Sequence, residues 1–468
     1  MKLPIEFEAR MRALLGDEYG AFERSFDTPP VRALRVNTLK MSVEKFLSLC
    51  DFPVTPVPFC PEGFYFEFDG IGHHPLHHSG AIYVQEPAAM AVAECCEISP
   101  DMKILDLCAS PGGKTSQAAA KLSGNGLIVT NEIIPDRCRV LLQNVERLGI
   151  SNAVVTNADT ERLSSLRGFD LVIVDAPCSG EGMMRKNQNA VDEWSIENVK
   201  MCAERQKEIL ANAARTVAVG GRLLYSTCTF APEENELQID SFLKCHPDFR
   251  LVPVSERVRA VTRDGVRFEG VSAENIEFCR RFYPHVSPGE GQFMALLERT
   301  DGELEPDVPE GAKKDKKARR GRDGNEKKAG NKDADAALVR DFLRTVLEND
   351  PLESGMLSLE EKPDGFYLTP SVSLPENAVF SAGVKVGTVE KGRVIPHHRF
   401  FMAFGPLFRI KVDLKANDPR IAAFLHGDVI PADVPAGFAA VLFEGAALGG
   451  GKVSAKTLKN YYPKGLRE

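Results

Sequence analysis

The sequence predicts an α/β fold in which a doubly wound, mainly parallel sheet occupies residues 79–300. Two observations support this prediction. Apolar runs of strand length alternate with helical stretches between about Ser79 and Arg299. The runs are continuously apolar, which is typical of strands buried on both faces of a parallel sheet. The 468 residues, 43% hydrophobic and 26% charged, suit several globular domains and exclude a wholly disordered or coiled-coil chain.

The elements are expected in the following order. Five segments are predicted as buried parallel strands: KILDLC (103–108), GLIVTNE (126–132), AVVTNA (153–158), FDLVIVDAP (169–177) and GRLLYSTCT (221–229). Helices are predicted at 115–122, 135–149 and 197–217, the last closed by Gly220 and Gly221 as a C-cap. FMALLER (293–299) is expected to add an edge strand. A ligand of such a sheet binds at the carboxyl ends of its strands.

Composition divides the rest of the chain. We expect a small N-terminal α+β module at 1–78, the α/β domain at 79–300, a charged flexible linker at 301–336 and a β-rich region at 337–468, which begins with a helix at 337–348. Between Gly311 and Lys332, ten Lys and Arg residues face only three acidic residues, and apolar residues are almost absent. This tract cannot bury enough surface to order itself. It is either a solvated linker or a tether that contacts RNA.

The net charge and the spacing of the cysteines indicate where the protein is expected to act and what it is expected to contact. The formal net charge of −8 argues against a uniformly basic nucleic-acid coat, although local patches govern phosphate contact. The N-terminus lacks an apolar signal region, and no run approaches the roughly 18 apolar residues of a membrane span. The eleven cysteines include no CxxC pair. We therefore expect a cytoplasmic protein with reduced thiols, no membrane contact and no metal site.

The segment ILDLCASPGGKT predicts a ligand-binding turn between a strand and a helix. A nucleotide-binding P-loop is excluded because Cys108 stands where that motif requires glycine, and the GxGxxG fingerprint also fails. S-adenosylmethionine fits better, since its carboxylate can lie near backbone N–H groups at the helix start. Asp106, Glu132, Asp159 and Asp175, each at or just beyond a strand end, offer acceptors for its amino group, ribose and adenine. A turn that serves packing alone is the alternative.

Two cysteines follow neighbouring parallel strands. DAPCSGEG (175–182) and YSTCT (225–229) place Cys178 and Cys228 just past strand ends, so both are expected to face one cleft. Loop N–H groups in such positions can lower the pKa of a thiol. Most buried cysteines are inert small hydrophobes, and we interpret Cys95, Cys96, Cys138, Cys202 and Cys245 in that way.

These motifs resemble those of the Sun/Nop-type RNA (cytosine-5) methyltransferases. The resemblance rests on YVQEPAAM (83–90), DLCASPGGKT (106–115), DAPCSGEG (175–182), GGRLLYSTCT (220–229) and PEENE (232–236). The strings HHRFFMAFG (397–405) and LKNYYPKGLR (458–467) are similar to the bacterial ribosomal RNA RsmF/YebU group. The resemblance implies a Rossmann-like S-adenosylmethionine-dependent methyltransferase core, a C-terminal PUA-like module, and methylation of cytosine C5 in RNA, with small-subunit ribosomal RNA as the expected substrate. The alternatives are a transfer RNA enzyme, a DNA cytosine-5 enzyme, and a catalytically silent ribosome assembly factor.

The resemblance also implies roles for individual residues. Cys228 would attack C6 of cytosine to form a covalent adduct, Cys178 would assist proton removal or adduct breakdown, Asp175 would bind the cytosine edge, and Lys114 would support the acidic cluster. The implied cofactor contacts are Cys108, Ala109, Ser110, Pro111, Gly112, Gly113, Lys114, Glu132, Asp159 and Asp175.

A cytosine target must be unpaired or flipped, and its flanking phosphates need cations. Six cations are candidates, with ordinary solvated charge as the alternative: Arg32, Arg35, Lys40, Lys45, Arg185 and Lys186. Trp194 can stack on a base, although packing is favoured.

The C-terminal end combines Tyr461 and Tyr462 with several cations, a mixture that suits contact with RNA backbone and bases. The cations are Lys452, Lys456, Lys459, Lys464 and Arg467. HHPLHH (73–78) lacks partners at ligand spacing. We expect a monomer whose partner is ribosomal RNA or the small ribosomal subunit.

Overall fold

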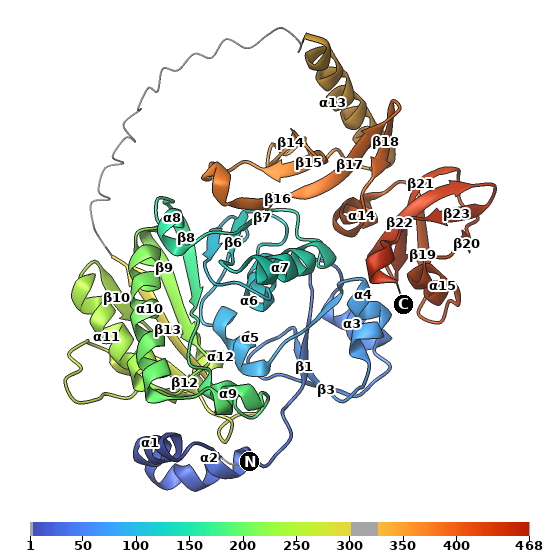
Figure 1. Ribbon diagram of the computed structural model, residues 1–468. Coiled ribbons are helices and arrows are strands. Elements are labelled where there is room, and N and C mark those ends of the chain that lie inside the picture. The colour runs from blue at the N-terminus through green and yellow to red at the C-terminus, as the bar shows by residue number, and fades with distance from the viewer. Residues whose placement is uncertain (1–2, 301–325, 468) are drawn as a thin grey trace.

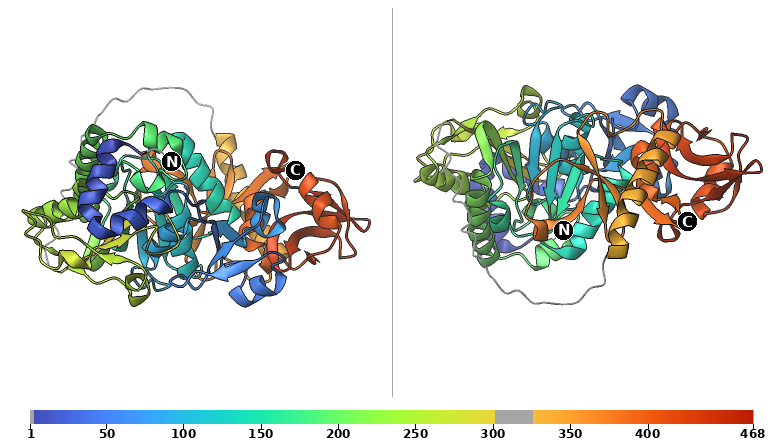
Figure 2. Two further views of the ribbon diagram at one scale, coloured as in Figure 1. Left: turned by 90° about the horizontal axis from the view of Figure 1, so that it is seen from below. Right: turned by 90° about the horizontal axis from the view of Figure 1, so that it is seen from above.

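A computed structural model describes residues 3–300 and 326–467 (Figure 1). The chain forms a central α/β domain, an N-terminal module and two C-terminal sheets, and the C-terminal sheets gather on one side of the central domain (Figure 2). Most of the predicted basic tract, residues 311–325, lies outside the described residues. Within the described ranges no helix combines the length and the apolar character needed to cross a membrane.

The central sheet confirms the predicted doubly wound core. Its order is β11-β12-β13-β9-β8-β5-β6-β7-β16, with β10 paired to β13. The parallel strands are β5 (Lys103–Asp106), β6 (Leu127–Asn131), β7 (Ala153–Thr156), β8 (Phe169–Asp175) and β9 (Val217–Thr227). The antiparallel strands beyond β9 are β10 (Phe249–Val252), β11 (Arg263–Asp264), β12 (Arg280–Phe282) and β13 (Gln292–Arg299).

Helices cover both faces of this sheet because its strands are apolar on both sides. One face packs against α5 (Pro87–Ala93), α6 (Gly113–Lys121), α7 (Pro135–Arg147) and α12 (Glu256–Arg259). The other packs against α8 (Thr160–Leu163), α10 (Ile196–Ala214) and α11 (Glu236–Cys245). The short α9 (Gln188–Asp192) lies in the loop after β8. The carboxyl ends of β5 to β9 therefore meet at one open edge.

Two predicted details are wrong. Strand β13 is not an edge strand, since it lies between β9 and β12 and also pairs with β10. Helix α10 ends at Ala214, and Gly220 and Gly221 lie inside β9 rather than in a C-cap. A Cβ on Gly221 would lie 2.9 Å from backbone oxygens of Phe169 and Ala218. This glycine therefore serves close strand pairing.

The N-terminal module extends past its predicted boundary. It contains α1 (Ile5–Leu15), α2 (Tyr19–Ser25), α3 (Val43–Leu49), α4 (Pro75–His78), β1 (Ala33–Val36), β2 (Val54–Pro56), β3 (Gly63–Phe66) and β4 (Ile82–Val84). The antiparallel sheet β2-β3-β1-β4 takes its last strand from beyond residue 78. Helices α1 and α2 leave this sheet and pack on Trp194 and Phe230 of the central domain. The first 78 residues are therefore not a separate folding unit.

The C-terminal region contains more structure than the sequence predicts. Its helices are α13 (Glu326–Val346), α14 (His398–Phe404) and α15 (Arg420–His426). One sheet, β14-β15-β17-β18, is formed by β14 (Leu357–Lys362), β15 (Gly365–Pro370), β17 (Val384–Glu390) and β18 (Arg393–Pro396). The other, β19-β21-β22-β23-β20, is formed by β19 (Lys411–Leu414), β20 (Ile430–Pro431), β21 (Gly437–Phe443), β22 (Ala446–Ser454) and β23 (Thr457–Asn460).

Two boundaries in this region differ from expectation. Helix α13 begins at Glu326, within the predicted linker 301–336, and covers most of the helix expected at 337–348. Strand β16 (Val379–Ala382) pairs with β7 and so completes the central sheet (Figure 1). Residues 337–468 are therefore continuous with the central sheet through this strand.

Two of the cations expected to contact RNA are structural. Arg35 is 1% exposed, and it donates from Nε to Gln85 Oε1 (3.1 Å) and from Nη2 to Ser116 Oγ (2.7 Å). Lys40 donates to the carbonyl of Met402 in α14, and burial lowers its pKa to about 7. Both side chains join modules. Arg35 is buried and cannot reach a phosphate, so that assignment is wrong, whereas Lys40 is partly buried and its hydrogen bond to Met402 favours a structural role.

Candidate active site

A pocket of about 980 Å³ opens at the carboxyl ends of the parallel strands. Of the ten residues expected to bind the cofactor, five line it: Cys108, Ser110, Glu132, Asp159 and Asp175. Both predicted catalytic cysteines, Cys178 and Cys228, also line it. Ala109, Pro111, Gly112, Gly113 and Lys114 form the turn and the start of α6 behind this wall. The strand order thus brings distant motifs to one cavity.

The turn after β5 is built around Asp106. Thr115 Oγ1, at the start of α6, donates to Asp106 Oδ2 (2.6 Å), while Asp106 Oδ1 is buried without a hydrogen-bond partner among the described residues. Burial raises the pKa of Asp106 to about 7. Gly112 begins the helix with φ 108°, a left-handed conformation that favours glycine. The turn therefore holds a buried carboxyl group of which one oxygen, Oδ1, still lacks a donor among the described residues.

Glu132 and Asp159 lie on the pocket wall. Glu132 follows β6; its Oε1 accepts from the N–H of Ile134 (2.9 Å), and its Oε2 lies 3.4 Å from Arg137 Nη2. Asp159 N-caps α8, where its Oδ1 accepts from the N–H of Arg162 (2.8 Å). These contacts fix both carboxylates at the ends of adjacent strands β6 and β7.

The sequence analysis missed an apolar part of this wall. Ile133 and Ile134 follow Glu132, line the pocket, and are 59% and 47% exposed. Two adjacent exposed aliphatic side chains on a pocket wall give that wall an apolar patch that a ligand can cover. Their signal in the sequence is the pair of isoleucines between a strand-end acid and the proline that starts α7.

Cys178 and Cys228 meet in the pocket as predicted. Their sulfur atoms lie 3.2 Å apart, and both residues are partly exposed. The hydrogen bond to Cys228 and burial raise the pKa of Cys178 well above its usual value. The expectation of a lowered thiol pKa is thus wrong for Cys178, because its hydrogen bond with Cys228 and its burial both raise that pKa.

Asp175 is held by three donors. Lys114 Nζ lies 2.7 Å from Asp175 Oδ2, and Ser226 Oγ donates to Oδ1 (2.7 Å). Gln292 Nε2 lies 3.4 Å from the same Oδ1. Burial alone would lower the pKa of Lys114. The charge and hydrogen bond of Asp175 have a larger effect in the opposite direction, so the pKa of Lys114 is raised. Asp175 is thereby fixed on the wall that also carries both cysteines.

Two buried glutamates, to which the sequence analysis gave no role, connect the cysteine loops. Glu234 accepts from the N–H of Ser179 (3.0 Å), beside Cys178, and from Gln206 Nε2 (2.7 Å). Glu181 accepts from the N–H of Phe230 (2.9 Å), two residues after Cys228, and from Trp194 Nε1 (2.9 Å). Burial raises the pKa of Glu234 to about 7. Both glutamates occur in quoted motifs, GEG and PEENE, which was the available signal.

The expected RNA-contacting cations need revision near the cleft. Arg185 is buried and donates to Glu290, Gly289, Ser25 and Thr28. Its side chain is therefore structural, and the prediction of a phosphate contact in a flexible loop is wrong. Arg205 and Arg215, which the sequence analysis did not select, line the pocket and are exposed.

Two aromatic predictions are decided by burial. Trp194 is buried among Phe7 and other side chains of α1 and α2, which confirms packing as its role. Tyr462, expected to contact RNA, is 3% exposed and packs against Phe424 and His398, so that prediction is wrong.

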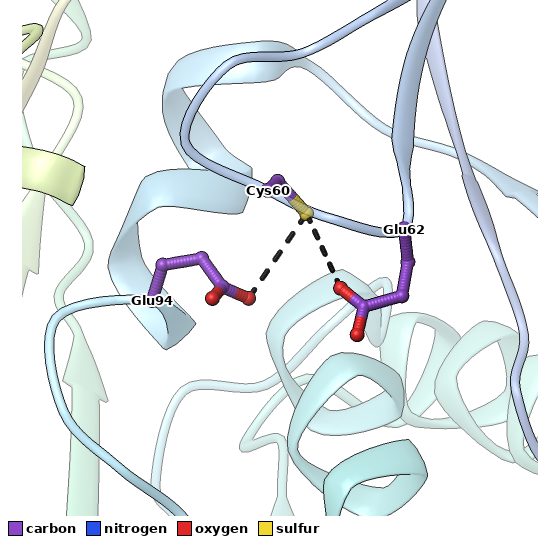
Figure 3. Close-up of side chains that lie close together, drawn as sticks. All are labelled: Cys60, Glu62 and Glu94. Carbon is purple, nitrogen blue, oxygen red and sulfur yellow. Dashed lines mark hydrogen bonds between the residues drawn. The ribbon is translucent and has the colours of Figure 1, made fainter.

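Cys60, Glu62 and Glu94 form a cluster outside the cleft, and Figure 3 shows their side chains pointing toward one another. Lys121 Nζ (2.8 Å) and Gln117 Nε2 (2.9 Å) already contact Glu94 Oε1. Burial, with the nearby Glu94 charge, raises the pKa of Cys60 to about 12, so the thiol keeps its proton. Protein groups satisfy this cluster, and we assign no metal to it.

Family models match three parts of the chain. Residues 94–298 match 16S rRNA methyltransferase RsmB/F, residues 3–87 match the N-terminal domain of 16S rRNA methyltransferase RsmF, and residues 411–468 match the methyltransferase RsmF PUA domain. The N-terminal match ends just after β4, in agreement with the four-stranded sheet.

Curated relatives share this organisation. The chain is 30% identical over 474 residues to ribosomal RNA small subunit methyltransferase F of Vibrio campbellii, covering 95% of this chain and 93% of that protein. It is 34% identical over 310 residues to the protein of the same name from Erwinia tasmaniensis, and this match spans 63% of each chain.

Solved structures resemble the chain over a similar length. A methyltransferase homolog protein from Pyrococcus horikoshii is 29% identical with a TM-score of 0.56, covering 63% of this chain and 94% of that chain. NSun6 from Pyrococcus horikoshii with SFG is 22% identical with a TM-score of 0.55, covering 64% and 99%. The latter likeness concerns the fold alone.

Proposed function

Since the chain belongs to the family of ribosomal RNA small subunit methyltransferase F, we propose that it transfers a methyl group from S-adenosylmethionine to carbon 5 of a cytosine in small-subunit ribosomal RNA. The observation that carries the proposal is the pair of partly exposed thiols 3.2 Å apart beside the fixed carboxylate of Asp175. Methylation of an oxygen or an exocyclic nitrogen needs no such pair, because those atoms are nucleophilic already.

A pair of cysteines suits a reaction in which the carbon that is methylated must first be activated. Cytosine C5 is a poor nucleophile, and a thiolate that adds to C6 converts the ring to an enamine that is reactive at C5. In the proposed step the Cys228 thiolate forms a bond to C6 as the electrons of the C5–C6 double bond shift toward N3, which takes up a proton from solvent at the edge that Asp175 would face. After C5 has taken the methyl group, C5 loses its proton, the bond between C6 and the Cys228 sulfur breaks, and N3 gives up its proton. These changes restore the thiolate and the aromatic ring.

Cys178 is suited to the steps that follow methyl transfer, in which C5 loses its proton and the adduct breaks down. The hydrogen bond to Cys228 is the largest cause of its raised pKa. Once the Cys228 sulfur is bonded to C6, Cys178 is the remaining thiol beside the adduct, since the two sulfurs lie 3.2 Å apart. In the proposed step it assists removal of the C5 proton, directly or through water. The contact between the sulfurs supports a division of labour between the two cysteines, and the assignment of each role follows the family resemblance.

The pocket residues fit S-adenosylmethionine. The cofactor supplies an electrophilic methyl group bonded to a sulfonium. Asp106 is fully buried directly before the lining residues Leu107 and Cys108, and its Oδ1 has no donor among the described residues, which suits the cofactor's amino group. Glu132 and Asp159 offer carboxylates at the next two strand ends, where ribose and adenine donors would lie, and Ile133 and Ile134 offer exposed apolar surface to a base.

We predict that Glu132→Ala and Asp159→Ala each weaken S-adenosylmethionine binding about fivefold to a hundredfold. Each change removes an acceptor for the cofactor, and such a loss costs about 1 to 3 kcal/mol. Isothermal titration calorimetry on the full chain measures the effect. Asp136→Ala, an exposed acid at the start of α7 that does not line the pocket, is the matched control. Wild-type affinity in both pocket variants would remove these residues from the cofactor site.

A second prediction concerns pH. Because the pKa of Asp106 is raised to about 7, the side chain carries a proton below pH 7 and cannot pair as a carboxylate with a cationic amino group. Affinity for S-adenosylmethionine should therefore rise between pH 5.5 and 7, at most about tenfold per pH unit. Asp106→Asn should bind weakly with a flat profile. Glu146→Gln is the control, since the pKa of Glu146 is also about 7 but it pairs with Arg399 away from the pocket.

The proposed activity is tested by bisulfite sequencing of small-subunit ribosomal RNA from a strain that lacks this gene. At least one cytosine that resists conversion in the parent should become convertible in the deletion strain, and the gene supplied in trans should restore resistance. An unchanged pattern in all small-subunit cytosines would exclude this substrate and favour a silent assembly factor or another RNA.

A further inference from the structure

A second pocket lies in the C-terminal region and shares no lining residue with the pocket at the ends of the parallel strands. It has a volume of about 510 Å³, and its lining comes mainly from α13, β18 and β21, which Figure 1 shows near one another. We call it the α13 pocket. Its walls come from both C-terminal sheets, and the carbonyl of Val346 at the end of α13 accepts from the N–H of Arg409 (2.9 Å), which ties the two sides together. It is therefore a preformed site between two modules.

Three aromatic side chains line this pocket. Phe342 of α13 and Phe438 of β21 have ring centroids 5.6 Å apart, and Phe438 and Tyr461 have centroids 6.2 Å apart. All three are only partly buried, so each keeps ring surface toward the pocket. Rings in this setting offer a stacking surface for a planar ligand.

Three cations surround the rings. Arg393, Arg409 and Lys452 line the pocket and are exposed. Lys452 Nζ lies 5.4 Å from the Phe438 ring centroid, and no carboxylate among residues 3–300 and 326–467 forms an ion pair with any of the three. Asp341 is the one acid on the pocket wall, so the lining carries a net positive charge within an acidic protein.

We propose that the α13 pocket binds an unpaired nucleotide of single-stranded RNA, with the base against the rings and its phosphates on the cations. The proposal rests on the proposed function, since it assigns the pocket to a second segment of the RNA substrate. Aromatic rings beside unpaired cations are the chemistry that holds single-stranded RNA without base pairing. An acidic peptide would use the cations but gains little from three clustered rings.

The experiment uses the full-length protein and a fluorescein-labelled 12-nucleotide single-stranded RNA that contains 4-thiouridine. Ultraviolet crosslinks, mapped by mass spectrometry, should include peptides of the α13 pocket. Tyr461→Ala should raise the Kd for this RNA about tenfold, whereas Tyr461→Phe, which keeps the ring, should stay within about twofold. Arg409→Ala and Lys452→Ala should each lower the slope of log affinity against log salt by about one.

Controls separate the possible failures. Lys464→Ala removes an exposed cation of the same module that does not line the pocket, and it should leave the pocket crosslinks unchanged. If the wild type methylates ribosomal RNA but the oligonucleotide crosslinks only in the cleft and every pocket variant binds as the wild type does, the pocket assignment alone is wrong. If the wild type neither binds nor methylates RNA, the proposed function fails with it. A different outcome would assign the pocket to an acidic protein instead. In that case a hexaglutamate peptide would bind, Arg409→Ala would abolish this binding, and RNA would form no crosslinks in the pocket.

Discussion

Cys228→Ala is expected to abolish methyl transfer to ribosomal RNA and to prevent any covalent complex between protein and RNA. Without the sulfur that attacks C6, no enamine forms and C5 stays unreactive, so the rate should fall at least about a thousandfold. Incorporation of a labelled methyl group measures the rate, and denaturing gel electrophoresis detects the complex. The effect should be on chemistry, and the Kd for S-adenosylmethionine should change little.

Cys245→Ala is the matched control for loss of a thiol. Cys245 is exposed at the end of α11 and does not line the pocket, so its removal should leave the rate unchanged. Continued formation of a denaturant-resistant RNA complex by Cys228→Ala would show that this residue is not the nucleophile.

Cys178→Ala is expected to behave in the opposite way. The nucleophile remains, so the adduct forms and one methyl group can be transferred, but proton removal from C5 and release of the RNA are impaired. The protein should accumulate as a covalent RNA complex that survives denaturant, while turnover falls. Loss of the S–H group beside Cys228 is the only chemical change in the pair.

Denaturing electrophoresis of Cys178→Ala, wild type and the double variant Cys178→Ala/Cys228→Ala separates the roles. The complex should be strong in the single variant, weak in the wild type and absent in the double variant. If Cys228→Ala traps RNA and Cys178→Ala does not, the two roles are exchanged.

The sequence predicted the features that depend on local pattern and strand order. The five parallel strands, the turn after β5 and the convergence of Cys178 with Cys228 follow from apolar runs and from the rule that parallel strands end at one edge. The cysteines are 50 residues apart in the sequence, yet Cys228 directly follows β9 and Cys178 lies three residues after the end of β8. Their meeting required only that β8 and β9 be neighbours.

Side-chain burial was less predictable because it depends on distant partners. Arg35 and Arg185 appeared to be free cations, but Gln85 and Ser116 bind the first and Glu290 binds the second. Strand β16 was missed because a short segment after the linker pairs with β7 at the far edge of the sheet. No local periodicity carries such information.

The central claim is that this protein places a methyl group on carbon 5 of cytosine. The most direct measurement incubates the purified protein with small-subunit ribosomal RNA, free and as assembled subunits from the deletion strain, and with S-adenosylmethionine that carries a deuterated methyl group. The RNA is then digested to nucleosides and analysed by mass spectrometry. The account predicts deuterated 5-methylcytidine in at least one of the two substrates and none with Cys228→Ala. The label in N4-methylcytidine or in a ribose methyl group, or equal labelling by Cys228→Ala, would contradict it.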